Sequence, residues 1–159
     1  MITLARMTDI KEIVDLFQAA KVEMLKAHIR QWNQSYPSYD LIKQDIADNR
    51  CYKLVVKGRI VCVATFIERG DGCWLKRLAT VSDCTKCGYA SQIYHYLEEL
   101  AIAKKIGYSY SATHHSNHKM QQFFLKHGFM RGEGYIEKTR SNYGLFYVFY
   151  KELEVETDE

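Results

Sequence analysis

The sequence has no apolar run long enough to cross a membrane and no strong charge of either sign. Its longest apolar run, residues 60–67, falls far short of the ~20 residues that a membrane helix needs. Arg6, Asp9, Lys11 and Glu12 stand where a secretory signal peptide would need an apolar core. The formal net charge is only +3, and the lysines and arginines are scattered rather than clustered. We therefore expect a cytoplasmic protein that binds neither membrane nor nucleic acid.

Repeats, linkers and low-complexity segments are also missing from the sequence. The 159 residues suffice for one domain and are too few for two ordinary ones. The apolar content of 47% and the charged content of 26% are typical of globular proteins. We expect a single domain over residues 1–153, followed by a mostly acidic tail over residues 154–159.

The cysteines permit two kinds of site that the rest of the sequence does not support. Five cysteines cannot all pair within one chain, and cytosolic thiols are normally reduced. Cys84 and Cys87 have the spacing of a thioredoxin-like redox site, but that fold relies on a cis-proline facing the cysteines, and the only proline here is Pro37. A zinc site would combine Cys73, Cys84 and Cys87 with one of three histidines, His114, His115 or His118. Because one Cys-x-x-Cys unit is weak evidence, we expect no metal.

Residues 73–103 read as an apolar strand, a polar loop and a helix, and the other elements are arranged around them. The helix has one apolar stripe at helical spacing, formed by Ile93, Leu97, Leu100 and Ala101. The first N–H groups of a helix have no intrahelical partner, and the helix dipole leaves about half a positive charge there. Gly88 and Ala90 leave this backbone accessible, and Lys86 adds a cation. Many such loops bind nothing, but this composition favours a phosphate-binding turn.

A second strand and a short helix follow the first helix. Gly107 ends the first helix, and residues 108–113 read as a strand. Asn117 then precedes a helix that Gly128-Phe129 closes with a helix-ending glycine. Because a whole helix separates the two strands, we expect a parallel crossover that is right-handed.

The remaining segments predict the other parts of a mixed sheet. Residues 2–5 alternate as a strand, and Asp9 with Glu12 has the spacing of a capping box before a helix that ends near Ala27. Ser38 is placed to cap a second helix. Two antiparallel hairpins complete the pattern, one joining residues 52–56 to 59–67 and one joining 135–139 to 145–153. We therefore expect an α/β fold, a central mixed sheet with antiparallel N-terminal strands and helices on both faces.

This chain resembles the GNAT superfamily of N-acetyltransferases. The acyl-CoA loop of that family reads Gln/Arg-x-x-Gly-x-Gly/Ala, and residues 85–90 here read Thr-Lys-Cys-Gly-Tyr-Ala. Its second signature, an Asn followed by a short helix that ends in Gly-Phe, is met by Asn117 and Gly128-Phe129. The order of elements also fits from Ile2 to about Leu153. The resemblance implies transfer of an acetyl group from acetyl-CoA, as cosubstrate, to a primary amine.

The resemblance also implies which residues hold acetyl-CoA. In the GNAT fold two parallel strands splay apart and the pantetheine arm pairs with the first of them, and the pyrophosphate lies over the loop. The implied cofactor-binding residues here are Leu78, Ala79, Thr80, Thr85, Lys86, Cys87, Gly88, Tyr89, Ala90 and Asn117. Thr85 replaces the usual Gln or Arg, and Phe124 replaces a Tyr that protonates the leaving thiolate in many members.

The sequence says less about the residues that bind the amine acceptor than about those that bind acetyl-CoA. In a GNAT-type fold the segment between the first two helices forms part of the acceptor site, so Trp32 and Tyr36 are implied substrate-binding residues, with Tyr39 as a further wall. Their alternative role is aromatic packing. Arg77 interrupts an apolar strand, where it binds an acidic substrate or pairs with a carboxylate of the fold.

Amine acetylation needs a base, because a lysine-like amine with a pKa of ~10.4 is charged at neutral pH. His114 follows the second parallel strand and is our candidate catalytic base, and a capping role is its alternative. Glu68 is a weaker candidate base. Tyr147 and Tyr150 carry hydroxyls that could supply the acid, but the sequence gives no geometric argument for either.

The acceptor itself is not identified by these patterns. A small amine, an amino acid, an antibiotic and a protein N-terminus all remain open, and the last hairpin offers an edge for a homodimer. The competing hypothesis is a non-catalytic module of the same fold that binds CoA or a partner.

Overall fold

The computed structural model describes residues 1–84 and 86–155, apart from the side chain of Cys84. Seven strands, four α-helices and three short 3-10 helices alternate along this part of the chain. They are β1 (Ile2–Leu4), η1 (Met7–Asp9), α1 (Ile10–Lys26), α2 (Tyr39–Ala47), β2 (Cys51–Val56), β3 (Arg59–Arg69), β4 (Gly72–Thr80), η2 (Ser82–Cys84), α3 (Tyr89–Ala103), β5 (Tyr108–His114), α4 (His118–Lys126), β6 (Met130–Ile136), η3 (Lys138–Tyr143) and β7 (Leu145–Glu152).

All seven strands form one sheet in the order β1-β2-β3-β4-β5-β7-β6. The first four strands pair antiparallel with their neighbours, as do the last three. The pair β4–β5 is parallel, with α3 as its crossover. The predicted mixed sheet, with antiparallel N-terminal strands, a parallel crossover and a C-terminal hairpin, is confirmed.

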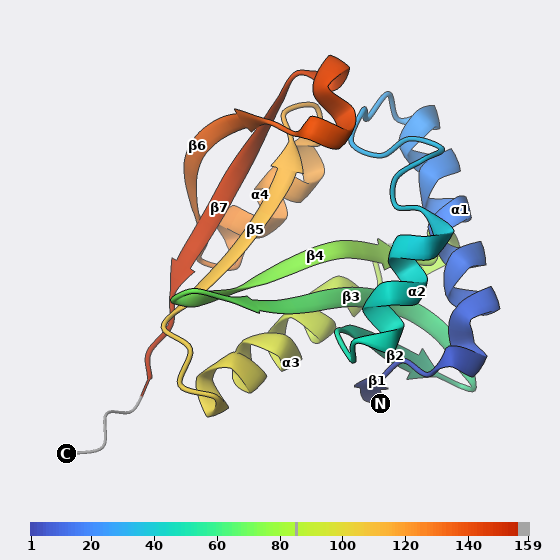
Figure 1. Ribbon diagram of the computed structural model, residues 1–159, viewed down its shortest axis with the longest axis horizontal. Helices are drawn as coiled ribbons and strands as arrows, with labels where there is room; N and C mark the ends of the chain where they lie inside the picture. Colours follow the sequence, from blue (N-terminus) through green and yellow to red (C-terminus); the bar gives the residue numbers. More distant parts are fainter. Residues whose placement is uncertain (85, 156–159) are drawn as a thin grey trace.

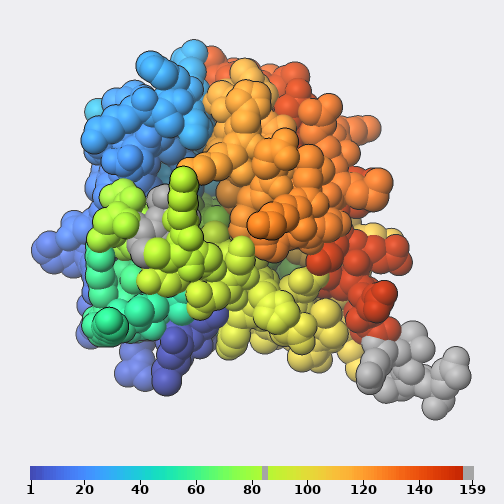
Figure 2. Space-filling view, turned by 180° about the vertical axis from the view of Figure 1, so that it is seen from behind, coloured from blue at the N-terminus to red at the C-terminus, as the bar shows by residue number. Residues whose placement is uncertain are grey.

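The helices cover both faces of the sheet. α3 and α4 lie side by side on one face (Figure 2), and α1 and α2 lie on the other side of the strands (Figure 1). The apolar stripe predicted for α3 is buried at Ile93, Leu97 and Ala101, and Leu100 is half-buried. Tyr94 lies next to this stripe and is also buried.

Two local predictions at the N-terminal helices have different outcomes. Ser38 caps α2, because its Oγ accepts a hydrogen bond from Leu41 N at 3.1 Å. The capping box at α1 is wrong: no side chain caps α1, and Asp9 instead accepts from Arg6 N at 2.8 Å. Glu12 accepts from Ile60 N on β3 at 3.1 Å. Its carboxylate therefore binds a strand amide and not the amide at the start of α1 that the capping box predicted.

The last hairpin begins earlier than predicted. β6 covers Met130–Ile136 rather than residues 135–139, and η3 occupies the connection to β7. β6 lies at the edge of the sheet and its side chains are largely exposed. A homodimer through this edge stays a prediction. Within the described residues no helix has the length and apolar character of a membrane span.

Candidate active site

The pair β4–β5 is joined at one end only. Register pairing between the two strands covers Gly72–Trp74 against Tyr108–Tyr110, and within the described residues it stops there. The ribbons then diverge toward the start of α3 and the start of α4 (Figure 1). Ala79 and Thr80 pair with β3 on one side, and within the described residues neither they nor the neighbouring Leu78 have a register partner on β5.

A bulge in β4 lies where the two strands part. Thr65 of β3 stands opposite Lys76 and Val63 stands opposite Ala79, so the register shifts by one residue between them. Arg77 occupies the bulge with a φ of 50°, a left-handed conformation that non-glycine residues rarely adopt. The bulge re-aims the side chains of this part of β4, and it brings Arg77 to the face that α2 covers.

The N-terminus of α3 is open. Gly88 is its N-cap residue with a φ of 78°, and no side chain caps this end. Among the described residues, a Cβ placed on Gly88 would meet nothing within 4 Å, so a ligand can approach the backbone of this residue from that side. Lys86 and Cys87 are exposed, and Tyr89 and Ala90 are half-buried. The first-turn amides and the helix dipole therefore face open space that fits a phosphate.

The other predicted cofactor residues have mixed placements. Thr85 lies outside the described residues. Asn117 is the N-cap of α4, since its Oδ1 accepts from Met120 N at 3.1 Å, and its Nδ2 donates to Gln31 Oε1 at 2.9 Å. Its side chain is thus used to hold the end of β5 against the segment between α1 and α2.

The cysteines of the described part show no metal centre. Cys51, Cys62 and Cys73 are free and buried, whereas Cys87 is disulfide-bonded. Among the described side chains, which do not include that of Cys84, no group of three His, Cys, Asp or Glu is placed to hold a metal ion. Burial raises the pKa of Cys51 and of Cys62 to about 12, so these two thiols are not reactive nucleophiles.

The three predicted substrate-binding residues lie together. Trp32, Tyr36 and Arg77 line one cavity, which we call the Arg77 cavity. It lies between the segment that links α1 and α2, the diverging strands and the η3 connection. Its other lining residues are Gln31, Lys76, Ala112, Tyr135, Glu137, Arg140 and Phe146. Tyr39 is 53% exposed at the start of α2 and is not part of this lining.

Arg77 has the structural role that its sequence position suggested, and its role in binding an acidic substrate stays a prediction. Its Nε and Nη2 donate to Asp45 at 2.7 and 3.0 Å, and its Nη1 donates to the Tyr36 hydroxyl at 3.1 Å. The carboxylate of Asp45 is buried on α2 and also accepts from Thr65 Oγ1 at 3.1 Å. Pairing with a carboxylate of the fold is therefore confirmed, and the guanidinium also forms part of the cavity wall.

Arg140, Gln31 and Glu137 are the residues that sequence reasoning missed. Arg140 is buried with its guanidinium carbon 3.7 Å from the Tyr36 ring centroid, and its Nη1 donates to the Gln31 carbonyl at 2.7 Å. Glu137 lies 3.7 Å from its Nη2. A polar turn such as residues 138–143 carries no local signal for a buried arginine, because the burial depends on contacts 109 positions away in the chain.

His114 is buried, with both ring nitrogens in hydrogen bonds. Nδ1 accepts from Ser116 N at 3.1 Å, and Nε2 therefore carries the proton and donates to the Tyr143 carbonyl at 2.5 Å. Burial lowers the pKa of the ring below its usual range. His114 can act as the catalytic base only if one of these hydrogen bonds opens first, because both ring nitrogens are engaged. Its catalytic role stays a prediction. The ring of His115 lies beside that of His114, with the two ring centroids 4.1 Å apart.

Neither His114 nor the other predicted proton-transfer groups are among the lining of the Arg77 cavity. Glu68 pairs with Lys104 at 3.0 Å on the surface. Tyr147 and Tyr150 are half-buried on β7, and Arg131 covers the Tyr147 ring at 4.5 Å. None of these three residues is among the lining of the cavity.

Phe124 is almost fully buried, and its ring lies beside the phenol ring of Tyr94. Their ring centroids are 6.1 Å apart. The Tyr94 hydroxyl hydrogen-bonds to Ser111 Oγ at 3.2 Å, and Ser111 donates to the Leu75 carbonyl at 3.0 Å. Leu75 follows Trp74, the last residue of β4 that pairs with β5. Tyr94 therefore brings a hydroxyl to the gap between β4 and β5. Its position three residues before Leu97, on the buried stripe of α3, is a periodic signal that could have identified it.

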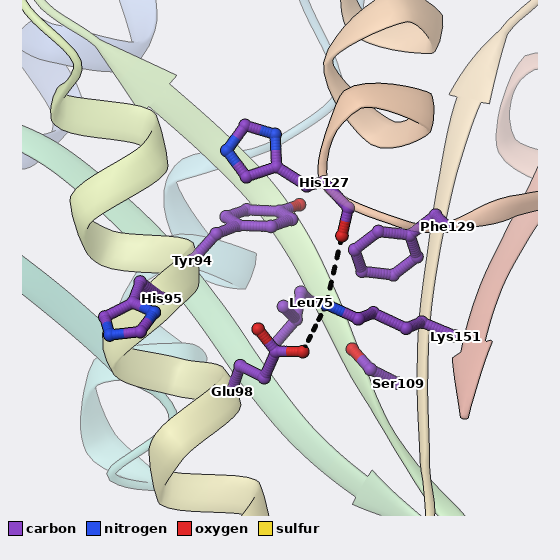
Figure 3. Close-up of a pocket in the computed structure, with 8 residues that line it drawn as sticks. All are labelled: Leu75, Tyr94, His95, Glu98, Ser109, His127, Phe129 and Lys151. Carbon is purple, nitrogen blue, oxygen red and sulfur yellow. Dashed lines mark hydrogen bonds and ion pairs between the residues drawn. The ribbon is translucent and has the colours of Figure 1, made fainter. Parts of the chain in front are cut away.

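A second hollow lies on the α3 side of the same strands (Figure 3). We call it the Lys151 hollow, and it is lined by Leu75, Tyr94, His95, Glu98, Ser109, His127, Phe129 and Lys151. Lys151 Nζ donates to the His127 carbonyl at 3.0 Å and pairs with Glu98 at 2.5 Å. Leu75 and Lys76 are adjacent on β4, so their side chains enter opposite hollows.

Comparison with known proteins matches this geometry to one family. The sequence model of the acetyltransferase (GNAT) family matches residues 12–129. A GNAT-family acetyltransferase of Streptococcus agalactiae has a similar structure, with a TM-score of 0.82 and 21% identity over 97% of this chain and 95% of that one. A search of curated proteins finds no match.

Two further solved structures share the fold at lower identity. The ribosomal-protein-S18-alanine N-acetyltransferase of Escherichia coli has a TM-score of 0.78 and 13% identity over 99% of this chain and 96% of that one. The PaiA N-acetyltransferase of Thermoplasma acidophilum, solved in complex with coenzyme A, has a TM-score of 0.78 and 12% identity over 96% and 98%.

Proposed function

This chain belongs to the GNAT acetyltransferase family, and from that premise we propose that it transfers an acetyl group from acetyl-CoA to a primary amine. The observation that carries the proposal is the divergence of β4 from β5 beyond Trp74, directly before the open N-terminus of α3. The divergence leaves strand backbone unpaired, and the α3 turn supplies amides for phosphate. A pantetheine arm and its pyrophosphate need these two features in this order along the chain.

The proposed cofactor contacts follow from that placement. The arm pairs with the backbone of Leu78, Ala79 and Thr80, and the pyrophosphate lies over the amides of Lys86–Ala90. Each hydrogen bond or dipole contact supplies about 0.5–2 kcal/mol, so several together reach micromolar affinity, which corresponds to about 8 kcal/mol. The Gln or Arg that Thr85 replaces is therefore dispensable. Asn117 contributes by fixing the start of α4.

In the proposed reaction the neutral amine nitrogen attacks the thioester carbonyl carbon. The C–N bond forms, the C–S bond breaks, and the CoA thiolate leaves with the electron pair. The ammonium proton has to go to a base, and His114 is the candidate from the sequence. A second candidate base is Glu137, a lining residue of the Arg77 cavity. The proton for the thiolate comes from water or from Tyr94, which replaces the hydroxyl that Phe124 lacks.

The test is turnover of acetyl-CoA with a panel of primary amines, read by product mass because thiol-reactive dyes would also titrate cysteines of the protein. An acetylated product that needs the protein supports the proposal. In parallel, the melting temperature is recorded with acetyl-CoA. A rise in melting temperature without any product would favour the competing function, a non-catalytic CoA-binding module, for which the missing hydroxyl at Phe124 is the one supporting observation.

A further inference from the structure

The charges that line the Arg77 cavity do not balance. Arg77 is neutralised by Asp45 through two hydrogen bonds, and Arg140 has Glu137 at 3.7 Å. Lys76 is the third cation of the lining. In the part of the chain that the structure describes, its ammonium has no hydrogen-bond acceptor or ion-pair partner.

The surroundings of Lys76 make this charge costly. The side chain is half-buried and its ammonium lies 5.2 Å from the centroid of the Trp74 ring, which supplies only a weak cation–π contact. Burial lowers the pKa of Lys76, and the positive charges of Arg77 and Arg69 lower it further, while Glu137 opposes this from longer range. A partly desolvated cation among cations is stabilised when an anion joins it.

The Arg77 cavity is small, with a volume of about 40 Å³. Since a site needs roughly 10–15 Å³ to hold one water molecule, a small polar group can enter it. The Tyr36 hydroxyl accepts from Arg77, so its own proton is available to a second acceptor in the cavity. Trp32 and Phe146 add apolar walls.

We propose that the amine acceptor carries a carboxylate, as an amino acid does, and that this carboxylate binds in the Arg77 cavity against Lys76 and the Tyr36 hydroxyl. This inference rests on the proposed function for the identity of the reacting group, and it narrows the acceptor to amines that also carry a carboxylate. Polycationic amines are disfavoured, because they would bring further positive charge to a cavity that already has one cation in excess.

The test measures binding without turnover. With saturating CoA present, isothermal titration compares N-acetylglycine with N-acetylglycinamide, which have the product-like amide and differ in the carboxylate. We expect the dissociation constant of N-acetylglycine to be at least tenfold lower. In Lys76→Gln this preference should vanish, and in Lys76→Arg, which keeps the charge, it should persist at least in part.

Lys138→Gln is the matched control, because it removes the same charge from an exposed neighbour outside the cavity lining, and it should keep the preference. Equal affinity for the two compounds, no binding of either, or a full preference retained in Lys76→Gln would overturn the proposal. The result is independent of catalysis: a protein that binds N-acetylglycine selectively but acetylates no amine would refute the proposed function and leave the carboxylate site standing.

Discussion

In the Lys151 hollow the ammonium donates to a carbonyl and pairs with Glu98, whereas in the Arg77 cavity the ammonium of Lys76 has no such partner in the described structure. The two hollows lie on opposite sides of the same pair of strands. A partly buried cation that is paired within the chain serves the fold, because removing it leaves a carboxylate without its partner. One that lacks a partner lowers stability and is most simply explained by a ligand.

The Arg77 cavity also contains a paired cation, so the comparison can be made within one site. Arg77 is matched by Asp45, and both side chains are less than a tenth exposed. Arg77 therefore shapes the cavity and Lys76 is left to attract the ligand. The predictions below run from the largest expected effect to the smallest, and the first and the last of them, at Arg77 and at Lys151, test this comparison of cations directly.

Arg77→Met should lower the free energy of unfolding by about 3 kcal/mol, because it leaves the buried carboxylate of Asp45 without its bidentate partner. The loss stays near the lower end of the range for buried pairs, since Arg50 remains 3.5 Å from Asp45. Urea denaturation provides the measurement. The control is Arg59→Met, whose pair with Asp83 is more than half exposed and should be worth little. Equal losses of unfolding free energy in the two variants would contradict the argument that burial makes the Arg77–Asp45 pair the more important one.

Ala90→Glu should abolish the stabilisation by acetyl-CoA, which is about 2.7 kcal/mol at 100 times the dissociation constant. A carboxylate in the first turn of α3 would interact with the positive end of the helix dipole in place of the pyrophosphate, and it would repel the pyrophosphate. Thermal shift with and without acetyl-CoA reports the effect. Ala19→Glu, which adds the same charge at an exposed position of α1, should keep the full shift. A full shift in Ala90→Glu would place the cofactor elsewhere.

His114→Ala should cost about 2 kcal/mol of stability, because the Tyr143 carbonyl and Ser116 N lose their partner. The pKa of His114 is lowered in the folded protein, so the unfolded chain binds the proton more tightly. Stability of the wild type should therefore fall as the pH drops through the unfolded value of about 6.5, and the variant should show a shallower fall. Denaturation at several pH values between 7 and 5 tests both.

The same variant tests the base. At saturating acetyl-CoA, a loss of at least a hundredfold in rate together with a flattened acidic limb of the pH profile would assign the base to His114. A loss of that size confined to Glu137→Gln would assign it to the carboxylate of the Arg77 cavity instead. If both variants keep their rate, deprotonation runs through water.

Phe124→Tyr should change the acetylation rate by less than tenfold, under ~1.4 kcal/mol in activation free energy. A CoA thiol resembles free Cys in its pKa of about 8.5, so its thiolate leaves readily near neutral pH and gains little from an acid. The rate is measured at saturating acetyl-CoA in Phe124→Tyr and in Tyr94→Phe. A gain above tenfold in the first variant would mean that the missing hydroxyl limits the chemistry.

Lys151→Met should lower stability by about 1 kcal/mol and leave the preference for N-acetylglycine unchanged. The Lys151–Glu98 pair is about a quarter exposed, so solvent weakens its contribution. Lys43→Met on the exposed face of α2 provides the reference for removing a lysine. A loss of carboxylate binding in Lys151→Met would show that the two hollows are coupled and would end the separation drawn between them.

Local patterns were sufficient for most of the fold. The apolar period of α3, the glycine turns and the strand alternation each depend on residues a few positions apart, and these elements formed where they were expected. Ser38 caps α2 as its spacing predicts, because the cap and the amide it binds are three residues apart. The failure at α1 has a tertiary cause: Glu12 has the spacing of a capping box but accepts from Ile60 N instead, and that amide is 48 positions away in the chain.

By itself, then, the sequence determined the order of the elements, the open turn before α3 and the grouping of Trp32 and Tyr36 in one segment. Only the tertiary structure decided which charges are paired. Arg77 pairs with Asp45 across 32 positions, and Arg140 donates to the Gln31 carbonyl across 109. Lys76 is one residue from Arg77 and forms no ion pair within the described residues. No periodic pattern records such contacts, because they depend on how the bulge in β4 and the η3 connection are placed once the sheet has formed.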